Sequence, residues 1–401
     1  MLEILFLALL GCLLGTITGL TPGLHVNTIA IIGFSLFPTI SISPLEFAVV
    51  MVSMAITHTF LDFIPAIFLG VPEEATALSV LPTHQLLHQG KALEAIQLTA
   101  IGSLLGLGFS LLLVLPALFV IPIAYQFLRP YIVYILLIAV LLLMIREREK
   151  RRMFFSLIVF LMSGWLGFMM FQQKLLSTTQ VLFPVFVGLF GLSNIIYSLK
   201  SETQRIPQDE FVRVKIDKKI MSSGFLGSLG GILVGILPAM SPSQVGVLMY
   251  EIFGTNIRSF IISISAINTS DAIYSFIALY TINNPRSGVA TIVGKILEMD
   301  FNTLLFMIGT MAFTALFATF LHIKIGRLAM KFVGKINYRL LSIASLLLVL
   351  ILVYVITGFF GILIAFLATV IGLLPILGGV SRTHCMGVLL LPTILYFLGV
   401  G

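Results

Sequence analysis

The chain has 401 residues, of which 59% are hydrophobic and only 10% are charged. Charged residues make up about a quarter of an ordinary soluble domain, so this composition excludes that class and predicts an all-α, polytopic helical membrane protein. The formal net charge of +7 lies in short connections between apolar segments. Such charge sets orientation in the membrane, and we expect membrane lipids but no nucleic acid as partners.

Apolar segments follow one another along the whole chain, and several are too short to span a bilayer. They cover residues 2–20, 26–37, 47–69, 95–127, 131–145, 154–171, 181–199, 220–237, 245–253, 260–281, 301–321, 340–359, 361–377 and 386–400. The short segments predict half-helices or re-entrant pieces, and Pro116 is the expected break in the long segment 95–127. The first segment lacks basic residues and a cleavage site, so we interpret it as a retained helix.

The first apolar segment has a smooth face and then an interruption. Its glycines recur once per helical turn, at positions 11, 15 and 19, so a second backbone can touch that face. Thr21-Pro22-Gly23 then interrupts the helix, because Pro22 lacks an N–H and Gly23 tolerates unusual dihedrals. Lipid cannot satisfy the freed backbone groups, so the break must be buried in protein or line a wet cavity. The next helix directs its positive end at the break, which suits an anion, and its first polar residues are His25, Asn27 and Thr28.

The same interruption occurs again 216 residues later. Gly231, Gly235 and Pro238 repeat the spacing of Gly15, Gly19 and Pro22, and polar residues follow both prolines. Kinks used only for packing are the alternative interpretation. Paired breaks with polar neighbours are typical of a transporter site between two structural repeats. The candidate substrate-binding residues at the two breaks are Thr21, Pro22, Gly23, His25, Asn27, Thr28, Pro238, Ser241, Ser243 and Gln244.

Further matches divide the chain into two halves. Gly164, Pro184 and Gly191 match Gly372, Pro392 and Gly399 at an offset of 208 residues. We therefore expect an N-terminal transmembrane repeat over residues 1–199, a cytoplasmic linker over 200–216 and a C-terminal repeat over 217–401. The basic loops occupy non-matching positions in the two halves, which predicts inverted topology in the cell membrane. The N-terminus would then lie outside, and the stretch Lys200–Lys219 would lie in the cytoplasm.

Each half also contains an acid within an apolar run. Asp62 follows Thr57-His58-Thr59, and Asp271 follows Asn268-Thr269-Ser270. Carboxylates at this depth are costly and usually face a cavity or a partner, although a hydrogen-bonded structural acid is an equal alternative. Side-chain oxygens suit Na⁺, and a lone carboxylate suits H⁺. We therefore expect a coupling-ion site formed by Asp62, Asn268, Ser270 and Asp271.

Several chemical signatures are missing from the sequence. It contains no metal-spaced cluster, no nucleophile with a base and no glycine-rich phosphate motif, so we expect no enzyme, no metal site and no cofactor beyond the coupling Na⁺ or H⁺. Arg382 has no acidic neighbour in sequence and is the best candidate to meet a carboxylate or phosphate. An interfacial anchor would explain this arginine equally well.

Three segments resemble one known family. They are GLTPGLHVNTIA (19–30), VPEEATALSVLPTHQLLHQGKALEA (71–95) and VLFPVFVGLFGLSNII (181–196). In this order they resemble motifs of the large membrane subunit of the tripartite tricarboxylate transporters. The resemblance implies a secondary permease that takes up carboxylates with an ion gradient. A solute-binding protein and a small membrane subunit are its possible partners.

The chain also departs from that family pattern. It is shorter than the typical bacterial large subunit and resembles the compact stand-alone members seen in archaea, for which a binding protein is not assured. Where the family has Thr-Pro-Gly and small residues, this chain has Val71-Pro72-Glu73-Glu74. Two acids at this place would repel a tricarboxylate unless they face away or bind cations.

The leading prediction is an ion-coupled secondary transporter, a symporter, of a small organic anion such as a di- or tricarboxylate. The alternative is a polyprenyl-phosphate lipid-carrier translocase, which the proline-led broken helices also resemble. An intramembrane enzyme is a third possibility, and the missing catalytic constellation counts against it. A closed polar cavity would favour the soluble anion, and a groove open to the bilayer would favour the lipid.

Overall fold

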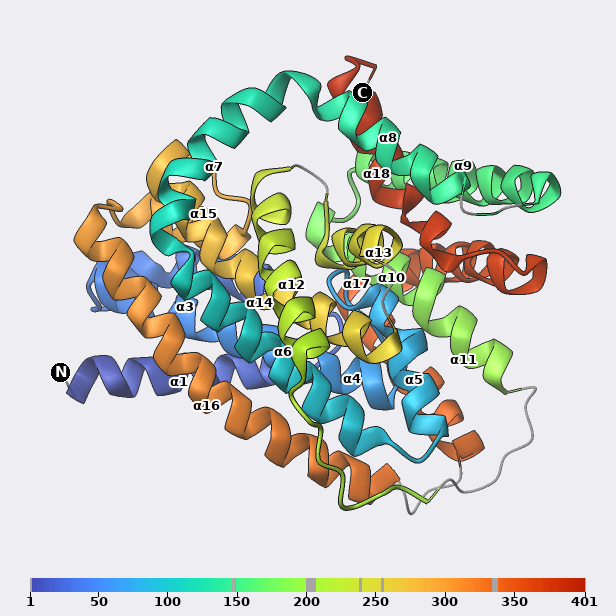
Figure 1. Ribbon diagram of the computed structural model, residues 1–401, viewed down its shortest axis with the longest axis horizontal. Helices are drawn as coiled ribbons and strands as arrows, with labels where there is room; N and C mark the ends of the chain where they lie inside the picture. Colours follow the sequence, from blue (N-terminus) through green and yellow to red (C-terminus); the bar gives the residue numbers. More distant parts are fainter. Residues whose placement is uncertain are drawn as a thin grey trace.

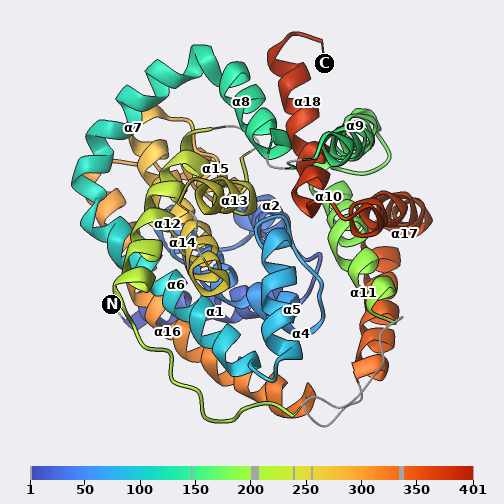
Figure 2. The same cartoon turned by 45° about the vertical axis from the view of Figure 1, so that its right-hand side comes forward.

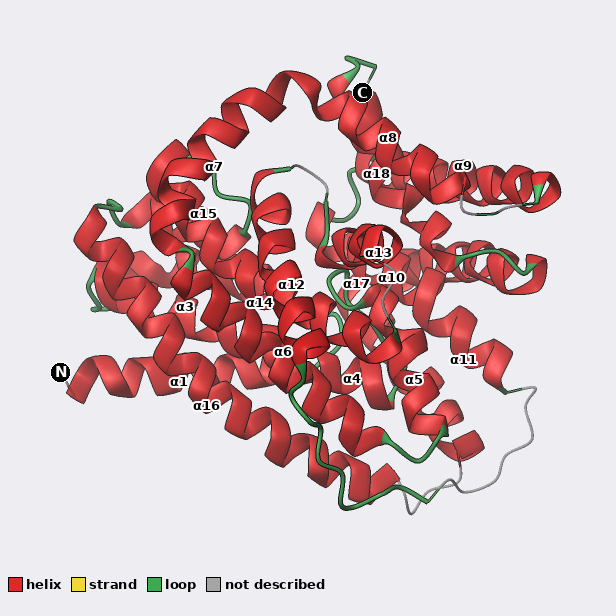
Figure 3. Cartoon of the chain, viewed as in Figure 1, coloured by secondary structure: helices red, strands yellow, loops and turns green. Residues whose placement is uncertain are grey.

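A computed structural model describes residues 2–145, 147, 149–199, 207–237, 240–253, 256–333 and 338–400. Within these ranges every regular element is a helix and none is a strand (Figure 3). The same ranges contain ten helical segments that are long and apolar enough to cross a membrane. The prediction of an all-α, polytopic membrane protein is confirmed.

The helices of the first half of the chain include both long spans and short pieces. In chain order they are α1 (Leu2–Leu20), α2 (Val26–Leu36), η1 (Phe37–Thr39), α3 (Pro44–Leu61), α4 (Phe63–Phe68), η2 (Ala77–Ser79), α5 (Val80–His88), α6 (Ala92–Leu112), α7 (Val114–Leu128), η3 (Arg129–Tyr131), α8 (Ile132–Ile145), α9 (Lys150–Gln172), α10 (Thr178–Phe186), the π-helix η4 (Val187–Leu192) and α11 (Ser193–Ser198).

The second half begins after the polar stretch that follows α11. Its helices are α12 (Lys218–Ile236), α13 (Pro242–Phe253), α14 (Ile257–Ile282), α15 (Gly288–Ile296), α16 (Phe301–Val333), α17 (Tyr338–Gly378), η5 (Arg382–Met386) and α18 (Gly387–Phe397). The backbone inside α17 is not helical at Gly358, where φ is +65°. This kink lies close to the boundary expected between residues 359 and 361.

One sequence expectation needs correction. The break between α6 and α7 lies at Leu113 and not at Pro116, because a proline is tolerated in the first turn of a helix, where its missing N–H is not needed. The polar stretches after α4 and after α14 each contain a short helix. These helices are α5 and α15.

Matching elements recur at the spacing that the sequence repeats suggest. Both ends of α12 lie 216 residues after the ends of α1, and both ends of α15 lie 208 residues after the ends of α5. This regularity agrees with two structural repeats. Their inverted relation and their boundaries at residues 199 and 217 stay predictions.

The glycine faces of α1 and α12 each lie against one long helix. A Cβ atom on Gly15 would lie 2.5 Å from the carbonyl oxygen of Met54 in α3. A Cβ atom on Gly231 would lie 3.0 Å from the amide nitrogen of Asp271 in α14. Only glycine permits these close approaches, so the expected helix contacts are confirmed. As a result, Asp62, which directly follows α3, and Asp271 of α14 are brought next to the two breaks.

The ends of the fold can be followed in two views. The corner made by α7, η3 and α8 lies along the upper edge of Figures 1 and 2, and residues 207–217 run along the lower edge. These linker residues are fixed to α6, because Gln97 Nε2 donates to Val212 O (2.7 Å) and Gln97 Oε1 accepts from the Val214 N–H (3.1 Å). The corner and the linker therefore lie on opposite sides of the molecule.

Candidate functional site

A cavity of about 350 Å³ lies where the two interrupted segments meet. Its wall also includes parts of α3 and α14, the turn after α4 and the turn before α15. We call it the central cavity. Its polar and charged lining residues are His25, Asn27, His58, Thr59, Asp62, Glu73, Glu74, Ser241, Asn268, Asp271, Arg286 and Ser287.

The first break presents the start of α2 to the central cavity. Gly23 has a φ of +86°, which L side chains rarely adopt, and a Cβ atom there would lie 2.5 Å from the Phe183 ring. His25 caps α2, since its Nδ1 accepts a hydrogen bond from the Asn27 N–H at 3.1 Å. His25 and Asn27 line the central cavity, whereas Gly23 lines a smaller pocket beside it. Thr21 and Pro22 line neither.

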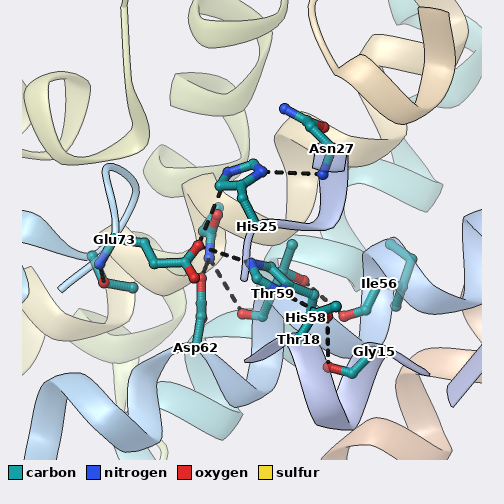
Figure 4. Close-up of polar contacts among 11 residues, drawn as sticks. Gly15, Thr18, His25, Asn27, Ile56, His58, Thr59, Asp62 and Glu73 are labelled. Atoms are coloured by element: carbon teal, nitrogen blue, oxygen red, sulfur yellow. Dashed lines mark hydrogen bonds and ion pairs between the residues drawn. The ribbon is translucent and has the colours of Figure 1, made fainter. Parts of the chain in front are cut away.

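Glu73, in the turn after α4, contacts two histidines (Figure 4). Its Oε2 lies 3.1 Å from His58 Nε2 and 3.9 Å from His25 Nε2. The other ring nitrogen of His58 lies 3.1 Å from Thr18 Oγ1 of α1, which fixes the orientation of the imidazole. Burial alone would raise the pKa of Glu73, but His58 and His25 hold it below its ordinary value. Glu73 is therefore ionised at neutral pH.

Asp62 and Asn268 form a polar contact between the two halves. Asn268 Nδ2 donates to Asp62 Oδ2 at 3.0 Å and to the Thr59 carbonyl oxygen at 3.3 Å. The other carboxylate oxygen of Asp62 is buried and has no hydrogen-bond partner among the described residues. A buried oxygen of this kind costs free energy unless a proton or a cation satisfies it.

Two further carboxyl groups border the same cavity. Asp271 Oδ1 is also buried without a hydrogen-bond partner in the part of the chain that the structure describes. Burial and the adjacent Glu73 raise the pKa of Glu74 to about 7. The lining thus brings together four carboxyl groups, two imidazoles and one guanidinium.

That guanidinium belongs to Arg286, which is not among the predicted site residues. Its Nη2 donates to the carbonyl oxygen of Ile236, the last residue of α12, at 3.2 Å. A cation at the C-terminal end of a helix is favoured by the helix dipole. The backbone N–H groups of Arg286 and Ser287 both donate to Ser275 Oγ, which holds the turn against α14. In sequence, the only signal was a basic residue in the polar turn after a long apolar helix.

Comparisons with known proteins identify the family. The model of the tripartite tricarboxylate transporter TctA family matches residues 5–387, which is nearly the whole chain. The chain belongs to this family. The family is one of transporters and not of enzymes, and it works within a tripartite transporter with other subunits. The resemblance read from the three sequence segments is confirmed.

Two relatives of the TctA-family chain are themselves described only as uncharacterized. One, from Methanocaldococcus jannaschii, is 31% identical over 412 residues, which cover 99% of this chain and 100% of the relative. The other, a 52.8 kDa protein from Agrobacterium vitis, is 24% identical over 312 residues, or 71% of this chain and 62% of the relative. No solved structure matches the chain.

Three further predicted site residues of the TctA-family chain, besides those of the first break, lie outside the lining of the central cavity. Ser243 Oγ donates to the Ala75 carbonyl oxygen at 2.7 Å and accepts from the Leu78 N–H at 3.3 Å, so it links the second break to the turn after α4. Gln244 Oε1 accepts from the Ser241 N–H, and Ser270 Oγ donates to a carbonyl oxygen within α14. Pro238 and the side chain of Thr28 fall outside the described residues.

Arg382 lies apart from the central cavity. Its Nη2 donates to the carbonyl oxygens of Leu189 (3.1 Å) and Phe190 (2.7 Å) and to Ser193 Oγ (2.8 Å). The guanidinium carbon also lies 5.6 Å from the centre of the Phe190 ring. The structure therefore assigns this buried cation to the π-helix η4 and to a separate pocket beside α5 and α13. Its predicted role, to meet a carboxylate or phosphate, therefore does not belong to the central cavity and stays a prediction for this separate pocket.

Proposed function

We propose that this TctA-family chain is an ion-coupled permease for a small organic anion, a di- or tricarboxylate. The observation that supports the proposal is one cavity to which both interrupted segments contribute polar groups. Arg286 offers a cationic fork suited to a carboxylate, and Asn27 and Ser241 add hydrogen-bond donors. A site between two broken segments near the middle of the fold is common among secondary transporters.

The charge of the central cavity supports ion coupling. Four carboxyl groups face one arginine, so an entering dianion is repelled unless protons or a cation neutralise part of the lining. The unpaired oxygens of Asp62 and Asp271 are the natural places for Na⁺ or H⁺, with the Asn268 amide beside them. Because ion and substrate then lower each other's electrostatic cost, they bind with positive, reciprocal coupling, as in a symporter.

The remaining parts of the proposal concern orientation and partners. The chain lies in the cell membrane with its N-terminus outside and the stretch Lys200–Lys219 in the cytoplasm. A small membrane subunit and a solute-binding protein deliver the substrate to it. The polyprenyl-phosphate alternative gains no support from the family match, and we retain it only as an outcome of the test.

The test is a ligand screen on the purified full chain, followed by uptake. Thermal unfolding is measured with citrate, succinate or a polyprenyl phosphate, each in Na⁺ and in K⁺ at pH 6 and pH 8. Uptake of the stabilising compound is then measured in proteoliposomes, with protein-free liposomes as the control. We expect a carboxylate to raise the melting temperature and to be taken up faster with an inward Na⁺ or H⁺ gradient. Stabilisation by the polyprenyl phosphate alone, or no gradient-dependent carboxylate uptake, would contradict the proposal.

A further inference from the structure

Arg286 borders a second cavity as well as the central one. This second cavity has a volume of about 510 Å³ and lies among α7, η3, α8, α9 and α18. Its polar and charged lining residues are Tyr125, Arg129, Gln172, Asn284, Arg286 and Thr393. We call it the arginine cavity. Since Arg286 belongs to both linings, its side chain lies between the two cavities.

The two cavities differ in charge. The central cavity combines four carboxyl groups with one arginine, whereas the described lining of the arginine cavity holds two arginines and no carboxyl group. An anion without accompanying ions is therefore bound more favourably in the arginine cavity. Apolar and aromatic side chains such as Phe168 and Tyr396 complete the wall, which reduces the competition from water.

The donors of the arginine cavity are only partly used by the protein. Arg286 Nε is buried and has no hydrogen-bond partner among the residues described, and its side chain donates one hydrogen bond, from Nη2. Apart from its contact with the end of α12, the guanidinium of Arg286 therefore makes no hydrogen bond within the described residues. Tyr125 accepts a hydrogen bond from Asn284 Nδ2 at 2.7 Å, so the phenol proton is free to point at another acceptor. Arg129 is exposed, and the structure gives it no ion pair within the described ranges.

The position of the arginine cavity relates it to one face of the molecule. Arg129 belongs to η3, in the α7–α8 corner, on the side opposite residues 207–217 (Figures 1 and 2). A solute that arrives from this side and enters the arginine cavity reaches Arg286, and beyond Arg286 the central cavity. The cationic cavity thus lies next to the α7–α8 corner and shares Arg286 with the acidic central cavity.

We propose that the arginine cavity is a separate binding site for a small carboxylate, held by Arg129 and Arg286, from which substrate passes to the central cavity. Each of the two guanidinium groups can form a bidentate pair with one carboxylate, so together they can hold both ends of a dicarboxylate. The passage to the central cavity rests on the proposed transport function. The binding site itself does not.

The chain provides its own reporter for this site. Trp165, the single tryptophan, stacks on Phe168 with ring centroids 5.7 Å apart, and Phe168 lines the arginine cavity. Neither ring lines the central cavity. Titration of the purified full chain with succinate, citrate or inorganic phosphate should therefore change Trp165 fluorescence in a saturable way when a carboxylate occupies the arginine cavity. Isothermal titration calorimetry on the same samples measures all binding, including binding in the central cavity.

We expect Arg129→Gln to lower the carboxylate affinity, measured from the Trp165 fluorescence titration, by about tenfold or more, because a charge-assisted hydrogen-bond pair is lost. Arg129→Lys, which keeps the charge but not the fork, should have an intermediate affinity. The matched control is Arg327→Gln, an exposed arginine of α16 that lines neither cavity, and it should bind as the wild type does. Size-exclusion chromatography confirms that each variant is folded.

Three results would overturn the proposal. Equal affinities of wild type and Arg129→Gln would remove the arginine from the site, and saturable binding of phosphate alone would refute the carboxylate assignment. The absence of a saturable response in both fluorescence and calorimetry would remove the site altogether.

Arg129-dependent binding without any carboxylate transport would retain the site while the proposed function fails. If transport occurs but uptake at low substrate is unchanged in Arg129→Gln, the passage through the arginine cavity is wrong.

Discussion

Replacement of Asp271 by asparagine tests how the central cavity accepts an anion. The change keeps the shape of the side chain and removes one of four carboxyl groups from the lining. The buried atom Asp271 Oδ1 has no hydrogen-bond partner among the described residues, so the substitution breaks no hydrogen bond of this atom. The variant should therefore fold at least as stably as the wild type, and any effect on binding should be electrostatic.

The size of the effect follows from the size of the cavity. A volume of about 350 Å³ corresponds to a width of about 9 Å, so a substrate charge at one side of the cavity lies roughly 8 Å from a carboxylate in the opposite wall. At an effective dielectric constant of about 20, two unit charges at this distance repel by about 2 kcal/mol, or roughly 30-fold in affinity. In the proposed mechanism the coupling ion removes this repulsion in the wild type, and the asparagine removes it permanently.

The assay compares substrate affinity in Na⁺ and in K⁺, at pH 6 and pH 8, for the wild type, Asp271→Asn and Glu298→Gln. Glu298 is an exposed carboxylate that does not line the central cavity, and it controls for the loss of one negative charge. We expect wild type and Glu298→Gln to gain affinity with Na⁺ or at pH 6, by about 5-fold to 100-fold, and Asp271→Asn to lose most of that gain. The same ion and pH dependence in all three proteins would remove Asp271 from the coupling mechanism.

Three further predictions concern stability, each measured as the melting temperature of the purified chain. Gly15→Ala should destabilise the protein by about 1–3 kcal/mol, because its Cβ would lie 2.5 Å from a carbonyl oxygen of α3. The control Gly108→Ala, whose Cβ would have no atom within 4 Å, should be neutral or stabilising. Equal effects of the two substitutions would refute the close helix contact. The pKa of Glu74 is raised to about 7, so its contribution to the free energy of unfolding is present at low pH and is lost as the pH rises toward 7. The wild type should therefore lose stability from pH 5 to pH 8 more steeply than Glu74→Gln. Parallel profiles of the two proteins would contradict this. Asn268→Ala should cost about 1.5–3 kcal/mol, because Asp62 loses its hydrogen-bond donor, and an unchanged melting temperature would show that this contact is not formed.

Local patterns in the sequence were sufficient to predict the helices that surround the site. Glycine spacing predicted the contact of α1 with α3, because residues one turn apart share a helix face whatever the rest of the chain does. The break at Pro22 followed from the chemistry of proline alone. Asp62 and Asp271 were selected because a carboxylate in an apolar run requires polar surroundings, and both line the central cavity.

Residues whose partners lie far away in sequence were harder to predict. Arg382 donates to carbonyl oxygens about 190 residues earlier in the chain, and no local pattern shows that a π-helix presents them. Ser243 was expected to line the cavity, but its hydroxyl binds Ala75 from the other half. Arg286 was missed for the opposite reason, since one basic residue in a polar turn looks like a solvated loop until its contact with the end of α12 is known.

The two hydrogen bonds of Ser243 bear on how the protein can change shape. Through Ala75 and Leu78 they join the second break to the turn that holds Glu73 and Glu74. The second break and the turn after α4 therefore move together as one rigid body, unless Ser243 releases both backbone groups. If the site opens first to one side of the membrane and then to the other, the enclosing helices would accordingly move around this joined unit. The free energy needed to break the two hydrogen bonds of Ser243 would oppose any independent movement of the two segments.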